Sequence, residues 1–537
     1  MTTPTDTQLS PTTDAATTVA TPPPSSNAGI ARAALIIGTG NVASRVLGLA
    51  REMVLTRYFG AGGMVSAYTI ASFVPQMLYD LIIGGMVSSA LVPVFSDYAE
   101  RGKKELGRVA SDVLTLTLIA MALLASLLMI FAPQVAYLLG GDLPPEYLAT
   151  TIGLLRLMAP ATIFLGLSGV TTAILYALRR FTLPAFVVAV YNATLVLTIV
   201  LSGGQNIIWA AIGLVLGAIA QVALQWPGLR DLPLRVRADL HDPALRRIIL
   251  LYLPMLLGIV AAQIGAIVDR RLASGVNESA IAWMRYATTL QQFPQGLVST
   301  AVSMAALPAL ARQVNDLPGF RRTLGFALRI VLLLVIPMAV GLFLLATPVV
   351  ATLFERGKFT PEDTLATAHA LRLYMLGLPF AAIDLPLVYA FYARGDTLTP
   401  NLVAFVGLAA YFAIALPFVD SYGVSALVAA NAAQLAAHAV VMIILAQRRF
   451  GAIRGQGLGT LLAKLSVASL AMGGAILAAL TLLAPLHLSE FWGALTTLVL
   501  AGGAGVVVFG VMVAGMRIDE AQLLAAMTVG RLRRRQT

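Results

Sequence analysis

The stretch from Ser44 to Tyr98 decides the fold: it reads SRVLGLARE from Ser44, YFGAG from Tyr58, SFVPQ from Ser72 and SALVPVFSDY from Ser89. Most of it is apolar enough to lie in a membrane. It nevertheless carries the charged residues Arg45, Arg51, Glu52, Arg57 and Asp80. A charge in mid-membrane costs about 2.5–3.5 kcal/mol on insertion scales, so it normally faces a protein interior or a wet cavity. We therefore predict a polar chamber inside a helical bundle, walled by the other apolar segments.

The composition indicates a polytopic membrane protein. Of 537 residues, 58% are hydrophobic and only 11% are charged, and the mean hydropathy is +0.86. Soluble proteins carry about 25% charged residues. Because a span needs roughly 20 apolar residues, the apolar runs predict an all-α fold with about fourteen transmembrane helices. We place these spans at 30–58, 65–95, 107–139, 148–178, 183–202, 206–227, 247–273, 279–311, 323–354, 364–394, 399–418, 422–447, 459–485 and 489–516.

The basic residues predict the orientation. With this set of spans, the loops on one side hold most of the Lys and Arg, for example Lys103–Lys104, Arg246–Arg247 and Arg448–Arg449. Positive residues collect on cytoplasmic loops, so we predict that both termini are cytoplasmic. The same rule explains the 36 Lys and Arg against 25 Asp and Glu, and we expect no nucleic-acid partner.

An internal repeat predicts the architecture. The LRL sequence around Arg156 returns around Arg372, and the YA sequence at Tyr176 returns at Tyr392, at the same offset along the chain. Six predicted spans, an even number, separate the copies, so the copies share one orientation. Parallel repeats of this kind are related by an axis along the membrane normal. We therefore predict two parallel six-helix lobes followed by two C-terminal helices.

The domain organisation follows from these segments. The first residues are rich in Thr, Pro, Ser and Ala, a composition that cannot bury enough surface to fold. We expect six regions: a disordered cytoplasmic tail at 1–28, the N-lobe at 29–228, a basic cytoplasmic linker at 229–246, the C-lobe at 247–449, the last two helices at 450–516 and a basic cytoplasmic tail at 517–537.

Nothing in the sequence indicates an enzyme or a cofactor. The absence of cysteine excludes disulfides, thiolate metal sites and cysteine nucleophiles. The four histidines, His241, His369, His438 and His487, lack metal-ligand spacing. No glycine-rich phosphate-binding motif indicates ATP hydrolysis. We expect a transporter with no cofactor and no metal site, driven by the membrane potential or an ion gradient.

With these features in view, the chain resembles the MurJ/MviN family of lipid II flippases, within the multidrug/oligosaccharidyl-lipid/polysaccharide exporter superfamily. The resemblance covers nearly the whole chain from about Ala31. It rests on SRVLGLAR from Ser44, FGA from Phe59, VPVF from Val92 and FERGKFT from Phe354. It implies a multi-pass protein of the bacterial cytoplasmic membrane that moves a disaccharide-pentapeptide on undecaprenyl diphosphate to the outer leaflet by alternating access.

The resemblance also implies partners and a tail site. The last two helices would form a groove for the polyprenyl tail. Membrane lipids and the cell-wall synthesis machinery are the further partners that it implies.

Such a substrate requires positive charge inside the protein. A diphosphate cannot cross hydrocarbon unaided, and arginine offers an always-charged fork that suits phosphate oxygens. The resemblance assigns this role to Arg45 and Arg51. We add Arg270 and Arg285 as further positive groups facing the cavity. Asp80 is an acid placed to pair with Arg51 or Arg285 across it.

Several positions depart from the family pattern. Ser66 stands where the family usually has Asp, and Gly84 replaces the usual Glu. Tyr79 and Asp80 stand where an essential cavity arginine is expected. In the eighth span, Thr288 and Thr289 replace Asn or Asp followed by Arg. Another lipid-linked glycan is therefore an alternative cargo.

Four charged residues are candidates for coupling or gating. Asp269 fits a family pattern at the end of the seventh span, and Asp384 lies inside the tenth. Arg156 and Arg372 occupy equivalent positions in the two copies. For Asp384 a hydrogen bond to a neighbouring helix, and for the two arginines an ion pair at the rim, are the structural alternatives.

Two other functional classes remain open. A drug antiporter of the same superfamily would share the lobes, but not the last two helices or the FERGKFT sequence. A membrane-embedded glycosyltransferase would need catalytic carboxylates in a large outer loop, and the predicted outer loops are too short. A flippase should show a lateral opening and a groove formed by the last two helices, whereas an antiporter should show a sealed wall.

Overall fold

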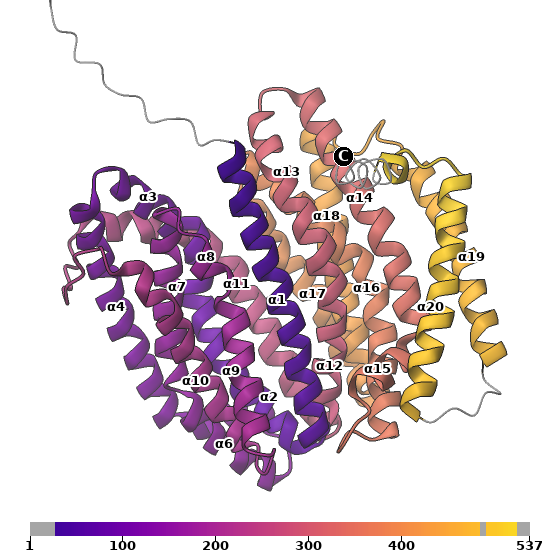
Figure 1. The fold of residues 1–537 in the computed structure, drawn as a ribbon, viewed down its shortest axis with the longest axis horizontal. Coiled ribbons are helices and arrows are strands. Elements are labelled where there is room, and N and C mark those ends of the chain that lie inside the picture. The colour runs from indigo at the N-terminus through magenta and orange to yellow at the C-terminus, as the bar shows by residue number, and fades with distance from the viewer. Residues whose placement is uncertain (1–26, 484–489, 524–537) are drawn as a thin grey trace, which may run out of the picture.

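A computed structural model describes residues 27–483 and 490–523, and every regular element in these residues is helical. Figure 1 shows the helices running side by side along one common direction. In the first half of the chain they are α1 (Asn27–Phe59), α2 (Gly63–Tyr79), η1 (Asp80–Gly84), η2 (Val87–Leu91), α3 (Val92–Glu100), α4 (Lys103–Ile130), α5 (Ala132–Gly140), α6 (Pro145–Met158), α7 (Ala161–Ala177), α8 (Thr182–Ala185), α9 (Val187–Leu201), α10 (Ile208–Gln225) and η3 (Trp226–Leu229).

The second half repeats this arrangement and adds two helices at its end. They are α11 (Pro243–Val276), α12 (Ala280–Pro294), η4 (Gln295–Ser299), α13 (Thr300–Arg312), α14 (Leu317–Leu344), α15 (Ala346–Phe354), α16 (Pro361–Ala393), α17 (Leu398–Tyr422), α18 (Val424–Phe450), α19 (Leu458–Leu483) and α20 (Glu490–Gly515). The yellow helices α19 and α20 lie at one edge, beside α14 and α15 (Figure 1).

The predicted repeat is visible in the helix bounds. The bent pair α6–α7 begins at Pro145 and ends at Ala177, and α16 begins at Pro361 and ends at Ala393, so both ends are displaced by the same offset as Arg156 and Arg372. The packing repeats as well, because α7 contacts α10 and α10 contacts α9, just as α16 contacts α18 and α18 contacts α17. The π-helical turns η1 and η4 also lie at nearly this spacing, so the same span is interrupted in both copies.

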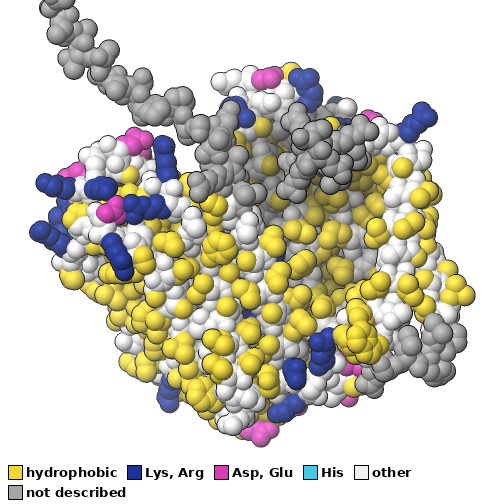
Figure 2. Space-filling model, in the orientation of Figure 1, with side chains coloured by type: hydrophobic (Ala, Val, Ile, Leu, Met, Phe, Trp, Pro, Cys, Tyr) yellow, Lys and Arg dark blue, Asp and Glu magenta, His cyan; other side chains and the backbone are white. Residues whose placement is uncertain are grey.

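The all-α membrane fold is confirmed, but the number of spans is not. Among the described residues, eleven helices are long and apolar enough to cross a membrane, and the pair α6–α7, bent by 45°, makes a twelfth. This criterion does not include α1 or the shorter apolar helix α9, so the expected fourteen spans stay a prediction. Figure 2 shows hydrophobic side chains over the middle of the molecule and many Lys and Arg near its upper edge.

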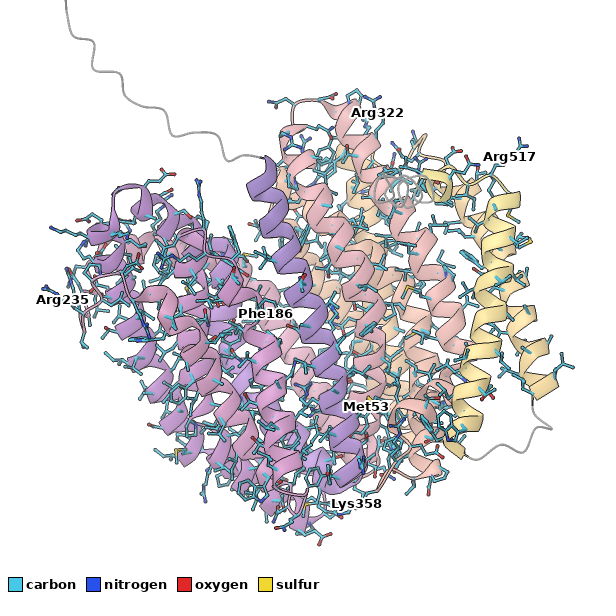
Figure 3. The ribbon with its side chains drawn as sticks, in the orientation of Figure 1. Met53, Phe186, Arg235, Arg322, Lys358 and Arg517 are labelled. Carbon is cyan, nitrogen blue, oxygen red and sulfur yellow. The ribbon has the colours of Figure 1, made fainter. Side chains whose placement is uncertain are left out.

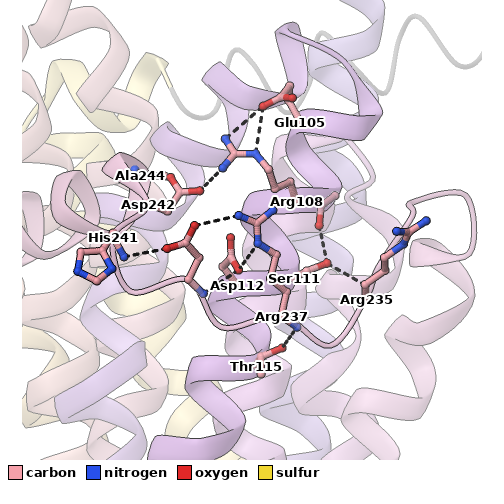
Figure 4. A network of polar contacts seen from close by, with 12 residues as sticks. Glu105, Arg108, Ser111, Asp112, Thr115, Arg235, Arg237, His241, Asp242 and Ala244 are labelled. Carbon is pink, nitrogen blue, oxygen red and sulfur yellow. Dashed lines mark hydrogen bonds and ion pairs between the residues drawn. The ribbon is translucent and has the colours of Figure 1, made fainter.

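The predicted domain boundaries remain predictions. The structure adds the contacts that hold the linker between the two lobes. The terminal segments 1–28 and 517–537 lie largely outside the described residues. The segment between the lobes packs along α4 (Figure 4). The backbone N–H of Arg235 donates to Ser111 at 2.9 Å, and Arg237 lies 3.2 Å from the buried Asp112. Asp242 accepts from Arg108 and caps the start of α11, so this basic linker is fixed to the N-lobe.

Candidate functional site

The buried Glu52 carboxylate lies between two arginines where α1 meets α12. Its side chain is 0% exposed. Arg285 holds it through two hydrogen bonds, Nε to Oε2 and Nη2 to Oε1, both 3.0 Å long. Arg51 donates to Oε1 from Nη2 at 2.6 Å. Because a buried charge without a partner is strongly destabilising, these three residues act as one unit, which we call the Glu52 triad.

The remaining donors of the Glu52 triad fix its position. Arg51 donates from Nη1 to Asn192 on α9, and Arg285 donates from Nη1 to Thr69 on α2, at 3.0 and 3.1 Å. The Arg285 guanidinium also lies 5.3 Å from the centre of the Tyr68 ring. The triad therefore joins α1, α2, α9 and α12, and its two guanidinium groups exceed its one carboxylate by one positive charge.

This unit forms one wall of a polar cavity of about 590 Å³. The cavity lies between the halves of the chain, with α1 and α2 on one side and α11, α12, α16 and α18 on the other. Polar side chains line much of it: Thr69, Ser72, Gln76, Thr288, Thr289, Gln292, Asn431 and Gln434. We call it the central cavity.

Asp269 and Arg270 of α11 line the same central cavity. Asp269 accepts hydrogen bonds from Tyr411 at 2.8 Å and Asn431 at 3.0 Å. Arg270 lies 3.6 Å from the centre of the Phe73 ring. Its Nη1 donates to a backbone carbonyl, and its buried Nε has no partner among the described residues. Arg270 thus retains an unused donor beside the cavity.

A second and larger hollow, of about 1050 Å³, is mostly apolar. We call it the apolar groove. It runs from α1 and α12 along α14 and α15 to the C-terminal helices α19 and α20. Its walls include Leu334, Met338, Met472, Ile476, Val506 and Phe509. The last two helices therefore form part of the wall of this groove.

Arg45 lines the apolar groove at its polar end. Its Nη1 donates to the backbone carbonyl of Gln292 at 3.0 Å. A Cβ on Gly296 would collide with the guanidinium of Arg45, so the absence of a side chain at Gly296 makes room for this group. Arg45 therefore connects α1 with α12 and lies against the π-helical turn η4 that follows it.

The central cavity and the apolar groove share part of their walls. Arg51, Thr289 and Gln292 line both. The polar cavity therefore adjoins the groove that α19 and α20 help to form.

Two of the motifs quoted from the sequence meet below the central cavity, near Lys358 (Figure 3). The backbone N–H of Lys358 donates to the carbonyl of Arg57 at 3.1 Å, and the Tyr286 hydroxyl donates to the carbonyl of Gly60 at 2.9 Å. Gly60 has φ +72°, and a Cβ there would lie 2.7 Å from the Lys358 oxygen. The FGA and FERGKFT sequences thus close this end of the interface between the two halves.

The other predicted site residues lie outside both hollows. Asp80 accepts from Gln76 on its own helix at 2.9 Å, so the expected pairing with Arg51 or Arg285 is wrong, because Glu52 takes that place. Arg156 of α6 and Arg372 of α16 occupy equivalent positions in the repeat. Arg156 donates to the Met129 carbonyl at 3.3 Å, and Arg372 donates to Thr347 at 2.8 Å.

Asp384 lies in the C-lobe, hydrogen-bonded to His438 of α18 at 2.8 Å. The helix-to-helix hydrogen bond, one of the two interpretations of this residue, is therefore present. The described residues contain no group of three or more His, Asp or Glu able to hold a metal ion.

The positions that depart from the family pattern lie in three places. Thr288 and Thr289 line the central cavity, where both hydroxyls donate to the Arg285 carbonyl. Ser66 is fully buried, and its hydroxyl has no partner among the described residues. Tyr79 and Gly84 lie next to Asp80, away from the arginines.

Sequence reasoning missed the central role of Glu52. We named it among the charges of the first span but gave it no partner. The signal was present, since an acid next to Arg51 in an apolar helix needs compensation by a further cation. Asn192 and Thr69 gave no such signal, because neutral polar residues are common in membrane helices.

Comparison with known proteins agrees with this geometry. A family model described as "Lipid II flippase MurJ" matches residues 55–495. This chain belongs to the lipid II flippase MurJ family. The lipid II flippase MurJ of Burkholderia cenocepacia is 29% identical over 393 residues, which cover 70% of this chain and 75% of that protein. The probable lipid II flippase MurJ of Haemophilus influenzae is 30% identical over 421 residues, 74% of this chain and 82% of that protein.

Solved structures show the same fold. A lipid II flippase MurJ in an inward closed conformation superimposes with a TM-score of 0.76 at 25% identity, covering 90% of this chain and 99% of that one. An inward-facing multidrug transporter of the MATE family gives a TM-score of 0.67 at 15% identity and covers 76% of this chain. The second likeness concerns the fold alone. This member of the MurJ family is therefore a multi-pass membrane protein with a transporter fold.

Proposed function

We propose that this protein moves lipid II from the inner to the outer leaflet of the bacterial cytoplasmic membrane by alternating access. One observation carries the proposal: an arginine-lined polar cavity and an apolar groove share Arg51, Thr289 and Gln292. Lipid II has a diphosphate-linked glycopeptide head and a long polyprenyl tail. The central cavity is polar like the headgroup, and the apolar groove is apolar like the tail. The two hollows adjoin, as the head and the tail do.

Some of the arginines are already hydrogen-bonded to protein side chains, whereas others keep donors for a substrate. In the Glu52 triad, hydrogen bonds to protein already occupy Arg51 and Arg285. Arg270 keeps a buried Nε that has no partner in the described part of the chain, and Arg45 faces the groove while it donates to a backbone carbonyl. We infer that Arg270 and Arg45 make the first contacts with the diphosphate, while the triad supplies the surrounding positive field.

The orientation and the energy source belong to this proposal. The basic loops favour an arrangement in which both termini are cytoplasmic. The end of the interface near Lys358 then faces the outside. The membrane potential or an ion gradient drives the cycle, since one charge crossing the membrane gains about 2.3 kcal/mol per 100 mV. The cell-wall synthesis machinery is the partner that would consume the delivered substrate.

A second cargo is supported by specific positions. Thr288 and Thr289 line the central cavity where the resemblance leads us to expect a charged or amide side chain followed by arginine. Fewer positive groups on α12 favour a headgroup with fewer acidic groups than lipid II has. Another polyprenyl-diphosphate-linked glycan is therefore the alternative. A drug antiporter is disfavoured, because the groove built with α19 and α20 would have no use there.

A headgroup-protection assay tests the proposal. Purified protein in proteoliposomes receives lipid II or a polyprenyl diphosphate that carries a neutral glycan, and the loss of accessible headgroups is measured over time. We expect transport of lipid II above the rate of empty liposomes. Transport of the neutral glycan alone would establish the alternative cargo. Transport of neither substrate, by protein that is folded, would contradict both.

A further inference from the structure

Asp384 and His438 form a hydrogen-bonded pair inside the C-lobe. Nδ1 of His438 on α18 lies 2.8 Å from Oδ1 of Asp384 on α16. The other ring nitrogen, Nε2, lies 3.2 Å from the backbone carbonyl of Pro400 on α17. The pair therefore connects three helices of the C-lobe.

The partners of His438 determine how many protons the pair holds. A carbonyl oxygen can only accept, so Nε2 must carry a hydrogen. One further proton must lie between Nδ1 and the Asp384 carboxylate, because two lone pairs facing each other at hydrogen-bonding distance would repel. The pair is then neutral overall, either as imidazolium with carboxylate or as imidazole with carboxylic acid. Release of this proton leaves one negative charge and one ring hydrogen, which can serve Asp384 or the Pro400 carbonyl but not both, so one of the two links of His438 is lost.

The other half of the chain places neutral residues at the equivalent positions. At the spacing of the repeat, Asp384 corresponds to Ser168, and at almost the same spacing His438 corresponds to Gln221. The Ser168 hydroxyl donates to Gln221 at 3.0 Å, and Gln225 donates to the Ser168 hydroxyl at 2.9 Å. The N-lobe therefore joins the equivalent helices, α7 and α10, with groups that do not ionise. Linking two helices at this position does not by itself require the ionisable residues Asp384 and His438.

The pair is connected to the central cavity through one face of α18. Gln434 lies one turn before His438 and lines the cavity, and Asn431 lies nearly one further turn back and donates to Asp269. Residues at these spacings share a helix face. A row of polar groups thus runs from the central cavity to His438.

The surroundings leave the pair free to exchange its proton. The side chains of Asp384 and His438 are 22% and 16% exposed. On α16, Tyr392 is the further titratable group close enough to interact with Asp384. α17 presents the Pro400 carbonyl and Gly407 to His438. In the described residues, no other ion pair includes Asp384 or His438.

We propose that Asp384 and His438 form a proton-binding site, and that release of its proton breaks one of the two hydrogen bonds by which His438 joins α18 to α16 and α17 during the transport cycle. The second clause rests on the transport function proposed above. The proton leaves to water or to the polar row of α18, and the pair changes from neutral to one negative charge. A proton gradient can then act on the C-lobe, while the N-lobe stays fixed by Ser168 and Gln221.

The proton site itself is tested by nitrogen NMR on the full chain in nanodiscs, with all histidines labelled with ¹⁵N. The His438 signals are assigned by their loss in His438→Gln. We expect them to change with pH between about 5 and about 9, and the midpoint to move by about one pH unit in Asp384→Asn. Signals that stay constant over this range, or a midpoint unaffected by Asp384→Asn, would overturn the proposal.

The coupling is tested by lipid II protection in proteoliposomes buffered on both sides. We expect the wild-type rate to be about threefold lower at about pH 6 than at about pH 8, because histidine retains its proton at the lower pH. His438→Gln should give equal rates. Gln221→Leu, the matched control in the N-lobe, should keep the wild-type ratio. A pH-independent wild-type rate, or a wild-type ratio in His438→Gln, would refute the coupling. A wild type that transports nothing would instead contradict the proposed function, and the NMR titration would still decide the proton site.

Discussion

Arg285 of α12 holds Glu52 of α1 through two hydrogen bonds of 3.0 Å, and these residues belong to opposite halves of the chain. Two-point bonds between guanidinium and carboxylate are among the strongest hydrogen-bonded contacts in proteins. The contact lies in the wall of the central cavity, where the two halves meet. The contact between Arg285 and Glu52 therefore joins the two halves of the chain. It also holds positive charge at the place where we expect the substrate headgroup.

Glu52→Gln should destabilise the protein. The substitution keeps the shape of the side chain but leaves Arg51 and Arg285 without a buried anion, and loss of one partner of such a pair costs about 3–5 kcal/mol. We expect a clearly lower Tm in detergent, measured by thermal unfolding. Glu52→Asp, which keeps the charge, should lose less. Equal Tm values for Glu52→Gln and wild type would show that the triad contributes no stability.

Arg51→Ala should abolish complementation of a bacterial strain depleted of its lipid II flippase. Arg51 belongs to the Glu52 triad and lines both hollows, so its loss removes positive charge where head and tail sites meet. Arg156→Ala is the matched control, because Arg156 lies outside both hollows and donates to a backbone carbonyl. We expect normal growth with the control. Normal growth with Arg51→Ala, at equal protein levels, would remove Arg51 from the mechanism.

A disulfide between Arg57→Cys and Lys358→Cys should stop transport. The backbone N–H of Lys358 donates to the Arg57 carbonyl at 3.1 Å, so the two segments are adjacent, as a disulfide between them requires. The chain has no cysteine of its own, so the engineered pair has no competitor. We expect oxidation to block lipid II protection and reduction to restore it. Full activity of the cross-linked protein would mean that this end need not open.

Asp231→Asn should weaken the cytoplasmic side of the N-lobe in a pH-dependent way. Hydrogen bonds from Arg180 and then from Lys103 lower the pKa of Asp231 below its ordinary value. The stabilisation is therefore complete above the ordinary pKa of about 4 and is lost as the pH falls through the lowered pKa. Since the carboxylate is 36% exposed, solvent screening limits the effect to about 1 kcal/mol or less.

The measurement is the Tm difference between wild type and Asp231→Asn at two pH values. We expect a lower Tm for the variant at about pH 7 and a smaller difference at about pH 3.5. Added salt at about 1 M should also reduce the difference at neutral pH. A difference that grows on acidification would contradict the assigned direction.

The repeat was predictable because it depends on matched residues at one spacing. The interval between Arg156 and Arg372 recurs at both ends of the helical segments that contain them. It separates the first residues of α6–α7 and α16, and it also separates their last residues. The resemblance assigned Arg45 and Arg51 to the cavity, and the need for positive charge added Arg270 and Arg285. Charges in apolar segments have few places to go, so their general location follows from the sequence.

Partners across the chain were not predictable in the same way. Asp80 and Glu52 are both acids in apolar segments, and only the three-dimensional packing decides that Glu52 meets Arg285, 233 residues away. The π-helical turns η1 and η4 carry no distinct sequence signal either. Their extra residue per turn is set by the fit between helices rather than by local preference.

The wall shared by the central cavity and the apolar groove has a consequence for inhibitor design. A small anion that fills only the cavity, or an alkyl chain that fills only the groove, has to bind with its own weak affinity. When a short linker joins the two, the second part binds at a high effective concentration, and the affinity can rise by about 10²–10⁴ without any new contact. The linker has to run from the central cavity past Arg51 and Gln292 into the apolar groove. The distance between the two hollows along this path sets the linker length of such an amphiphilic inhibitor.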